Sequence, residues 1–93
     1  MNNEKQILTL YIAGKTEKAL RAIENLNRYC EDHFQDLYAI KIVDLKEHPE
    51  LARSKQIIAV PTLIRELPAP IRILVGDLSD KEKVLIGLSI MPA

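Results

Sequence analysis

The sequence predicts a single α/β domain over residues 1–93, with the element order βαβαββα. Three observations support this fold class. An apolar run at 7–12 is followed by a segment with helical periodicity. Two short β-branched runs, 62–66 and 71–75, lie on either side of a connector that contains two prolines. The stretch 79–82, Ser-Asp-Lys-Glu, marks the start of a final helix.

The first half of the chain has the pattern of a strand–helix–strand unit. Residues 7–12 are almost continuously apolar, as expected of a central strand covered on both faces. Thr16 is the expected N-cap of an amphipathic helix. Residues 37–44 alternate, and Lys41 on one of their faces indicates a strand near an edge or an interface. The crossover should be right-handed, which makes the two strands parallel. The expected buried stripe of the helix contains Leu20, Ile23, Leu26, Cys30 and Phe34.

The second half begins with a short helix. Pro49 suits its first turn, because a missing amide hydrogen costs nothing there, and residues 50–55 continue it. In the final helix, Ser79 is the expected N-cap of a capping box in which the Glu82 side chain reaches back to the serine amide. This last helix is expected to end near 91–92.

The layout is that of a thioredoxin-like fold. In that fold the proline just before the third strand is often cis, and Pro61 occupies this place. Such an X-Pro turn lets the next strand run antiparallel to its predecessor. Thioredoxins carry a Cys-x-x-Cys pair at the end of the first strand, where this chain has Ala13-Gly14-Lys15-Thr16. A thioredoxin-like redox protein is therefore the weaker alternative.

Composition limits the partners that the chain can bind. Thirteen basic and thirteen acidic side chains give a formal net charge of zero, which argues against nucleic acid and membrane surfaces. With one Phe, three Tyr and no Trp, a base-stacking platform is not expected. The polar start and the lack of a long apolar segment predict a cytoplasmic protein. Because 93 residues bury a small core, we expect a homo-oligomer.

No residue pattern predicts catalysis or a cofactor. Residues 14–16 resemble a phosphate-binding loop, but that motif needs a glycine where Thr9 stands, so a simple turn is the better interpretation. Cys30 and His33 lie one helical turn apart, yet two ligands make no metal site, and His48 is distant in the sequence. A lone cysteine excludes an intrachain disulfide and fits a buried structural role. We predict a protein that is not an enzyme, with no catalytic residue, metal ligand or cofactor.

Five motifs run along nearly the whole chain: LYIAGKT (10–16), YAIKIVDL (38–45), AVPTL (59–63), ELPAPIR (66–72) and VGDLSDKEKVLIGL (75–88). Together they resemble the KaiB family of clock-associated proteins. The resemblance implies a non-catalytic interaction protein that binds a KaiC-like hexameric ATPase ring and modulates its signalling or phosphorylation cycle. It implies as a further partner a sensor histidine kinase whose thioredoxin-like domain competes for the same surface. A stress-response adaptor that no longer binds KaiC remains the alternative.

The same resemblance implies a set of partner-binding residues on or near one surface. An exposed strand edge beside guanidinium groups is a reasonable docking surface. Without the resemblance, the charged members would be ordinary solvated charges. Arg65 stands where the family usually has a lysine. The set is Arg21, Tyr38, Ala39, Lys41, Arg65 and Arg72.

The resemblance also implies two folds. In the family, the bound form is a thioredoxin-like monomer, whereas the free protein is commonly a tetramer whose second half is refolded to the order βαββααβ. We expect a dimer or tetramer here, refolded from about Leu51 onward. Because Gly87 weakens the last helix, its replacement by alanine should favour that helix by about 1 kcal/mol. Asp77 fits a turn better than a catalytic role. The residues assigned to the switch or to structure are Pro61, Gly76, Asp77, Gly87 and Ser89.

The chain departs from the family pattern at several positions. Ala69 interrupts a proline triplet, Ile73 replaces a basic residue and Ser89 replaces an acidic one. The acidic tail of cyanobacterial members does not follow Ala93. With these differences, two roles remain open for the protein. It is either part of a true oscillator or a protein with a KaiC-linked or stress-linked role in another bacterium.

Overall fold

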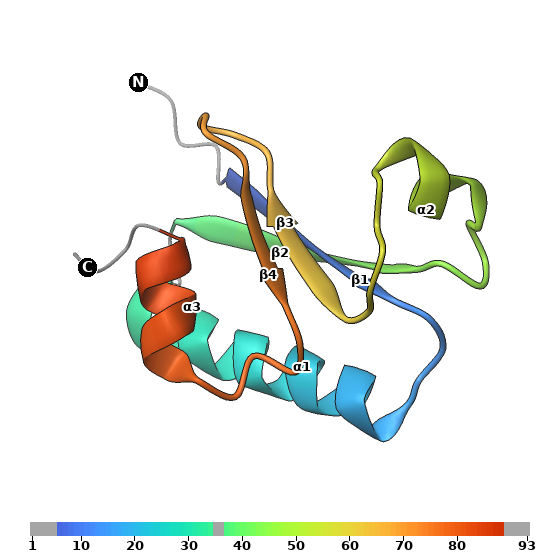
Figure 1. Ribbon diagram of the computed structural model, residues 1–93. Helices are drawn as coiled ribbons and strands as arrows, with labels where there is room; N and C mark the ends of the chain where they lie inside the picture. The colour runs from blue at the N-terminus through green and yellow to red at the C-terminus, as the bar shows by residue number, and fades with distance from the viewer. Residues whose placement is uncertain (1–5, 35–36, 89–93) are drawn as a thin grey trace.

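A four-stranded mixed sheet forms the centre of the computed structural model, which describes residues 6–34 and 37–88 (Figure 1). The strand order is β2 (Tyr38–Asp44), β1 (Gln6–Ile12), β3 (Thr62–Arg65) and β4 (Arg72–Val75). Strands β1 and β2 are parallel, whereas β3 is antiparallel to both β1 and β4. This confirms the predicted parallel pair, the antiparallel entry of the third strand, and the edge position of the strand that carries Lys41.

Three α-helices cover the sheet unequally. Helix α1 (Glu17–Tyr29) continues into a π-helical turn, η1 (Cys30–Phe34). Together with α3 (Lys81–Gly87) it lies on one face of the sheet, while the five-residue α2 (Glu50–Ser54) lies on the other (Figure 1). The observed order is the predicted βαβαββα, with the π-helical turn as an unpredicted extension. None of the described helices is long and apolar enough to cross a membrane.

Most of the core lies between the sheet and the pair α1 and α3. Leu8, Leu10 and Leu63 from the strands are fully buried there and join α1 through Ala22 and Leu26. A second, smaller cluster lies on the opposite face under α2. Its strand residues are Tyr11, Val43 and Ile64, and the residues packed against them include Leu51, Ala52 and Ile57.

Two burial predictions are wrong. Leu20 is 49% exposed, because the buried line of α1 runs through Ala19, Ala22 and Leu26 and leaves position 20 on the outer side. Strand β1 is central, but it is not covered on both faces along its whole length. Ile7 is 55% exposed although its neighbour Leu8 is completely buried.

The helix starts follow the predicted chemistry in one case and differ from it in another. The Thr16 hydroxyl accepts a hydrogen bond from the Ala19 amide at 3.0 Å, which confirms the N-cap of α1. For α3, the predicted capping box is wrong, because Asp80 is the N-cap and accepts from the Lys83 amide at 3.2 Å. Ser79 instead donates its amide to Asp77, and aspartate caps a helix as well as serine does.

The remaining fold predictions concern prolines and the chain end. The Val60–Pro61 peptide bond is cis, as predicted, and two further cis bonds precede Pro68 and Pro70. The predicted end of the last helix near 91–92 and the position of Ser89 lie outside the described residues.

The packing of α3 on β4 contradicts the expected effect of a substitution at Gly87. A Cβ at Gly87 would lie 2.6 Å from Leu74 Cδ2, and Gly87 is the last residue of α3 and not an exposed interior site. The overpacking cost of about 1–3 kcal/mol outweighs a propensity gain of at most about 1 kcal/mol.

We therefore predict that Gly87→Ala lowers the free energy of unfolding by about 1 kcal/mol. In a Leu74→Ala background the same substitution should be neutral or stabilising, because the clash is gone. Thermal denaturation of the four proteins of this double-mutant cycle measures both effects. Stabilisation by Gly87→Ala in the wild-type background would show that Leu74 does not restrict this position.

Candidate functional site

The loop between β1 and α1, where thioredoxins carry their cysteines, is held by a hydrogen bond to a carboxylate. Asp44 Oδ1 accepts the amide of Gly14 at 3.0 Å and that of Lys46 at 2.9 Å. These two hydrogen bonds hold the pKa of Asp44 below its ordinary value. Gly14 has a φ of 78°, which favours glycine. With its amide bound to a carboxylate, this loop is a structural turn, and the phosphate-loop interpretation has no support here.

The thiol and the histidines do not form a reactive centre within the described residues. Cys30 is a partly buried free cysteine in η1 and packs against the main core. His33 follows one turn later, and His48 lies before α2 with its Nδ1 3.9 Å from Glu50. Over 6–34 and 37–88, no three His, Cys, Asp or Glu side chains are arranged to hold a metal ion.

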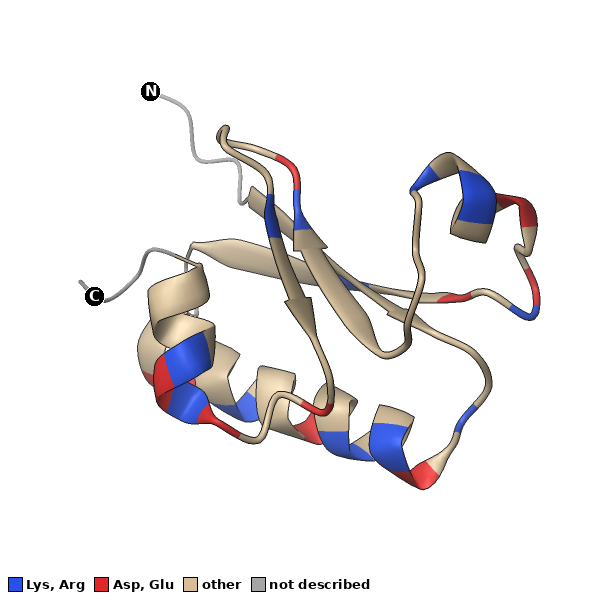
Figure 2. Ribbon diagram, in the orientation of Figure 1, with Lys and Arg blue, Asp and Glu red and all other residues tan. Residues whose placement is uncertain are grey.

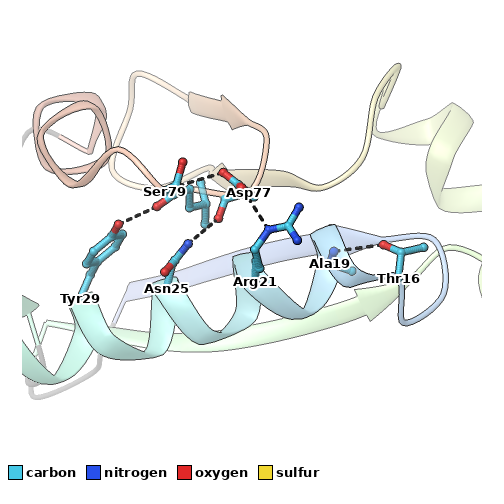
Figure 3. A network of polar contacts seen from close by, with 8 residues as sticks. Thr16, Ala19, Arg21, Asn25, Tyr29, Asp77 and Ser79 are labelled. Carbon is cyan, nitrogen blue, oxygen red and sulfur yellow. Dashed lines mark hydrogen bonds and ion pairs between the residues drawn. The ribbon is translucent and has the colours of Figure 1, made fainter.

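The turn at 77–79 is held by three side chains of α1 (Figure 3). Asn25 donates to the backbone oxygen of Asp77 at 2.9 Å, and the Tyr29 hydroxyl donates to that of Leu78 at 2.6 Å. The guanidinium of Arg21 donates to the Asp77 carboxylate at 3.4 Å. These side chains recur every four residues, so they share one face of the helix.

Asp77 has the turn-forming role that its neighbours predicted. Its Oδ1 accepts the Ser79 amide at 3.1 Å, while Oδ2 faces Arg21. Hydrogen bonds from Ser79, followed by that from Arg21, hold the pKa of Asp77 below its ordinary value. Gly76, with a φ of 115°, provides the left-handed backbone that starts this turn.

Arg65 lies in the interior, so its predicted place on or near the surface is wrong. The residue is 4% exposed. Its Nη1 donates to the Leu88 carbonyl at 2.7 Å, and its Nη2 lies 3.3 Å from the carbonyls of Pro68 and Pro70. The last carbonyls of a helix lack intrahelical donors, and a cation there also complements the helix dipole. Arg65 thus joins the end of α3 to the β3–β4 connector.

The other predicted partner-binding residues are distributed over several elements. Basic residues in general are spread over helices, strands and loops (Figure 2). Tyr38 is buried with its ring edge-to-face on Phe34, at a centroid distance of 5.3 Å. Ala39 and Lys41 are exposed and share one face of β2. Arg21 projects from α1, and Arg72 is half-buried on β4, at the opposite edge of the sheet. The structure brings together Ala39 and Lys41 on β2 and, across the β3–β4 pair, Arg65 and Arg72.

Sequence reasoning missed an apolar surface, which we call the open face. It is the part of the α2 side of the sheet that α2 leaves uncovered. The alternation of apolar residues in the run 71–75 was the available signal. Beside it runs a groove of about 840 Å³ that Thr9, Lys41, Leu51 and Ile64 help to line. Five large apolar side chains, each between 55% and 73% exposed, define the open face: Ile7, Leu67, Ile71, Ile73 and Val75.

The fold and the site define a thioredoxin-like domain without the redox cysteine pair. The N-terminal domain of Synechococcus elongatus SasA has the same fold, with a TM-score of 0.76 over 100% of this chain and 91% of that one at 13% identity. Mitochondrial thioredoxin 3 of Saccharomyces cerevisiae gives a TM-score of 0.74 over 96% and 82% of the two chains at 12% identity. At these identities the likeness concerns the fold alone.

The chain belongs to the KaiB family, as its motifs predicted. The model of the KaiB domain matches residues 9–90. The circadian clock oscillator protein KaiB of a Cyanothece species is 48% identical over 85 residues, which cover 91% of this chain and 81% of that protein. The protein of the same name from Synechococcus elongatus is also 48% identical, with 91% and 83% coverage.

The buried guanidinium of Arg65 generates a stability prediction. Arg65→Met should lower the free energy of unfolding by about 2–3 kcal/mol, because buried carbonyls lose a charged donor. Arg28→Met removes a guanidinium from an exposed pair with Glu24 and should change stability by less than about 0.5 kcal/mol. Urea denaturation of both variants measures the difference. Equal effects would show that the buried hydrogen bonds of Arg65 add nothing to stability.

Proposed function

We propose that this chain is a non-catalytic interaction module that binds a KaiC-like hexameric ATPase and modulates its signalling or phosphorylation cycle. Membership of the KaiB family and its relatives named as circadian clock oscillator proteins support this proposal. The observation that carries it is the outer edge of β2, which pairs with no other strand in the described part of the chain. A free edge with an exposed lysine accepts an extended segment of a partner through backbone hydrogen bonds.

The proposed contact residues are those that the fold leaves accessible. Ala39 is small and keeps the edge of β2 approachable, while Lys41 offers a charge beside it. Arg21 keeps a side-chain exposure of 55% although it pairs with Asp77. Arg72 is half-buried and supplies a further cation. In this proposal Tyr38 and Arg65 support the docking surface from within and do not touch the partner.

A competing partner fits the same proposal. A sensor histidine kinase with a thioredoxin-like domain would compete with this chain for the ATPase ring. Two domains of one fold present similar strand edges to a common partner, and the shared fold with the SasA domain supports this argument. The mechanism would be competition for a surface, which requires no chemistry from either domain.

We propose in addition that the structure is the partner-binding form of a cytoplasmic protein that has two folds. The free protein would be a homo-oligomer, either a dimer or a tetramer. In it, the half of each chain from about Leu51 onward would have a different fold. The short elements of that half support a small energy difference between the folds. Helix α2 contains no buried residue, and β3 and β4 have four residues each.

Size-exclusion chromatography of the purified protein with a KaiC-type ATPase and ATP tests the central proposal. We expect co-elution with the ring, and an apparent size above that of a monomer for the protein alone. Failure to co-elute would favour a stress-response adaptor that has lost KaiC binding. A single monomeric peak and one set of NMR signals, with and without the ring, would contradict the two-fold proposal.

Charge reversal at the proposed contacts gives a quantitative prediction. Lys41→Glu and Arg72→Glu should each weaken ATPase binding by about 1–3 kcal/mol, because a cation that faces the partner becomes an anion. The melting temperature of Lys41→Glu should change little, because Lys41 is exposed, whereas Arg72→Glu alters a half-buried side chain beside Arg65 and its stability is measured separately. Lys83→Glu on α3 is the matched control, because Lys83 is exposed and lies outside the proposed surface. Titration of the folded variants with the ATPase measures this loss of affinity. Unchanged ATPase affinity of both variants would remove Lys41 and Arg72 from the proposed site.

The thioredoxin-like alternative is tested through the single thiol. Because Cys30 packs against the core and has no second cysteine, the protein should show no activity in an insulin-reduction assay. Cys30→Ser should keep ATPase binding and lose at most about 1 kcal/mol of stability. Turnover by the wild type that disappears in Cys30→Ser would establish an enzyme.

A further inference from the structure

The two faces of the sheet differ in how well they are covered. One face carries the 13-residue α1 and the seven-residue α3. The other carries only the five-residue α2, which packs over Tyr11, Val43 and Ile64. The five side chains of the open face remain more than half exposed beside it. Contiguous apolar surface of this kind marks an interaction site, whereas isolated exposed apolar residues do not.

The registers place a cation and an apolar residue at the two ends of one row of the sheet. Lys41 of β2 pairs with Thr9 of β1, which pairs with Ile64 of β3, which pairs with Ile73 of β4. These four residues therefore share the face that α2 partly covers. Three steps between strands make this row about 14 Å wide, slightly more than the diameter of an α-helix with its side chains.

The charged side chains on the two sides of the groove differ: those on one side form an ion pair, whereas the lysine on the other side does not. At the mouth formed by α2 and the end of β3, Lys55 and Glu66 form an ion pair at 3.0 Å. At the β2 side, Lys41 is exposed and forms no ion pair with any residue in 6–34 or 37–88. Arg72 on β4 also forms no ion pair among the described residues, but it pairs with Arg65 and so belongs to the other face of the sheet. Among the strand residues of the α2 face, Lys41 is therefore the unpaired cation.

We propose that the open face binds an amphipathic α-helix of a protein partner, with its apolar side on Ile7, Ile71, Ile73 and Val75 and acidic residues along the flank that faces Lys41. A helix is the element that covers sheet faces in layered α/β domains, and one beside α2 completes this layer. A helix lying over β1 and β3 has β2 on one flank and β4 on the other. A second copy fits this face less well, because α2 stands above the sheet there and prevents flat stacking of two sheets (Figure 1).

This surface is distinct from the proposed docking edge. An edge strand binds a partner within the plane of the sheet through backbone groups, whereas the open face binds perpendicular to that plane through side chains. Lys41 borders both. Ile73 belongs to the open face alone, since it pairs with Ile64 on the α2 side, whereas its neighbour Arg72 pairs with Arg65 and belongs to the opposite face.

Two synthetic peptides test the proposal. Both form one amphipathic helix with leucines at helical spacing, and they differ only in a flank of glutamates or of lysines. The glutamate peptide should bind the full chain in the described fold, which the proposed function assigns to the partner-binding form, and should shift the amide signals of β1 and β4 of that form in NMR spectra. Ile73→Glu should weaken this binding about tenfold or more, as for a central apolar contact. Lys41→Glu should reverse the preference, so that the lysine peptide binds better.

A matched control and a second variant keep the test decisive. Leu20→Glu places the same charge on the outer side of α1, at a leucine that is 49% exposed, and should leave peptide binding unchanged. If Ile73→Glu does not fold, Val75→Glu at a 62% exposed position takes its place.

Three results would overturn the proposal. They are equal affinity for the two peptides, affinity that does not respond to Ile73→Glu, and a concentration-dependent dimer of the described fold that Ile73→Glu abolishes. The dimer would assign the open face to a second copy of this chain. Loss of peptide binding with intact ATPase binding would count against this proposal only, because the proposed ATPase contacts lie elsewhere except at Lys41.

Discussion

Helix α1 packs along the two central strands, and the other elements depend on this contact. Leu8, Leu10 and Leu63 from β1 and β3 meet Ala22 and Leu26 of α1, and all five are completely buried. Each fully buried leucine contributes about 1.5–3 kcal/mol relative to an exposed one. The alanine allows α1 to approach the sheet closely. Because so much of the apolar burial is on this face, the domain does not need an equally complete layer on the other.

The second half of the chain is attached to this core by apolar burial and by polar contacts. It contributes Leu63, Leu78, Val84, Leu85 and Leu88 to the main cluster. Arg21, Asn25 and Tyr29 of α1 bind the turn at 77–79, and Arg65 binds the end of α3 together with the proline connector. Hydrogen bonds to defined carbonyls depend more on geometry than apolar burial does, so they hold α3 in one position. These polar contacts therefore fix the position of the second half, while its buried leucines and Val84 share the main core with α1 and β1.

Local sequence rules predicted most of the elements, although they placed the cap of α3 at Ser79 and the structure has it at Asp80. Alternation and apolar runs predicted the strands. Thr16 predicted the N-cap of α1, and Asp77 next to Gly76 predicted a turn. Local rules could not predict which side of α1 is buried. The small Ala19 and Ala22 occupy the buried side, while the larger Leu20 is on the exposed side. Local rules also do not distinguish an arginine at the surface from one whose acceptors, such as Leu88, lie far along the chain.

One of the two candidate surfaces could be predicted from local sequence, and the other could not. The edge position of β2 followed from one lysine in an alternating strand, because alternation and edge chemistry are local. The open face did not, because its members come from β1, β4 and the connector, and only strand order makes them neighbours. Gly87 is a similar case, since its proximity to Leu74 is a property of how α3 lies on β4.

The position of Lys41 relates the two proposed surfaces to each other. A strand that pairs with β2 extends the sheet sideways, and a helix on the open face lies above it, so the two partners do not occupy the same volume. Both would nevertheless use the charge of Lys41, the exposed cation in the row that ends at Ile73. An acidic group bound from one direction neutralises the attraction from the other. The two binding events should therefore weaken each other, and by linkage the effect must be reciprocal. A small domain with one unevenly covered sheet can in this way couple two partners without any change in its own backbone.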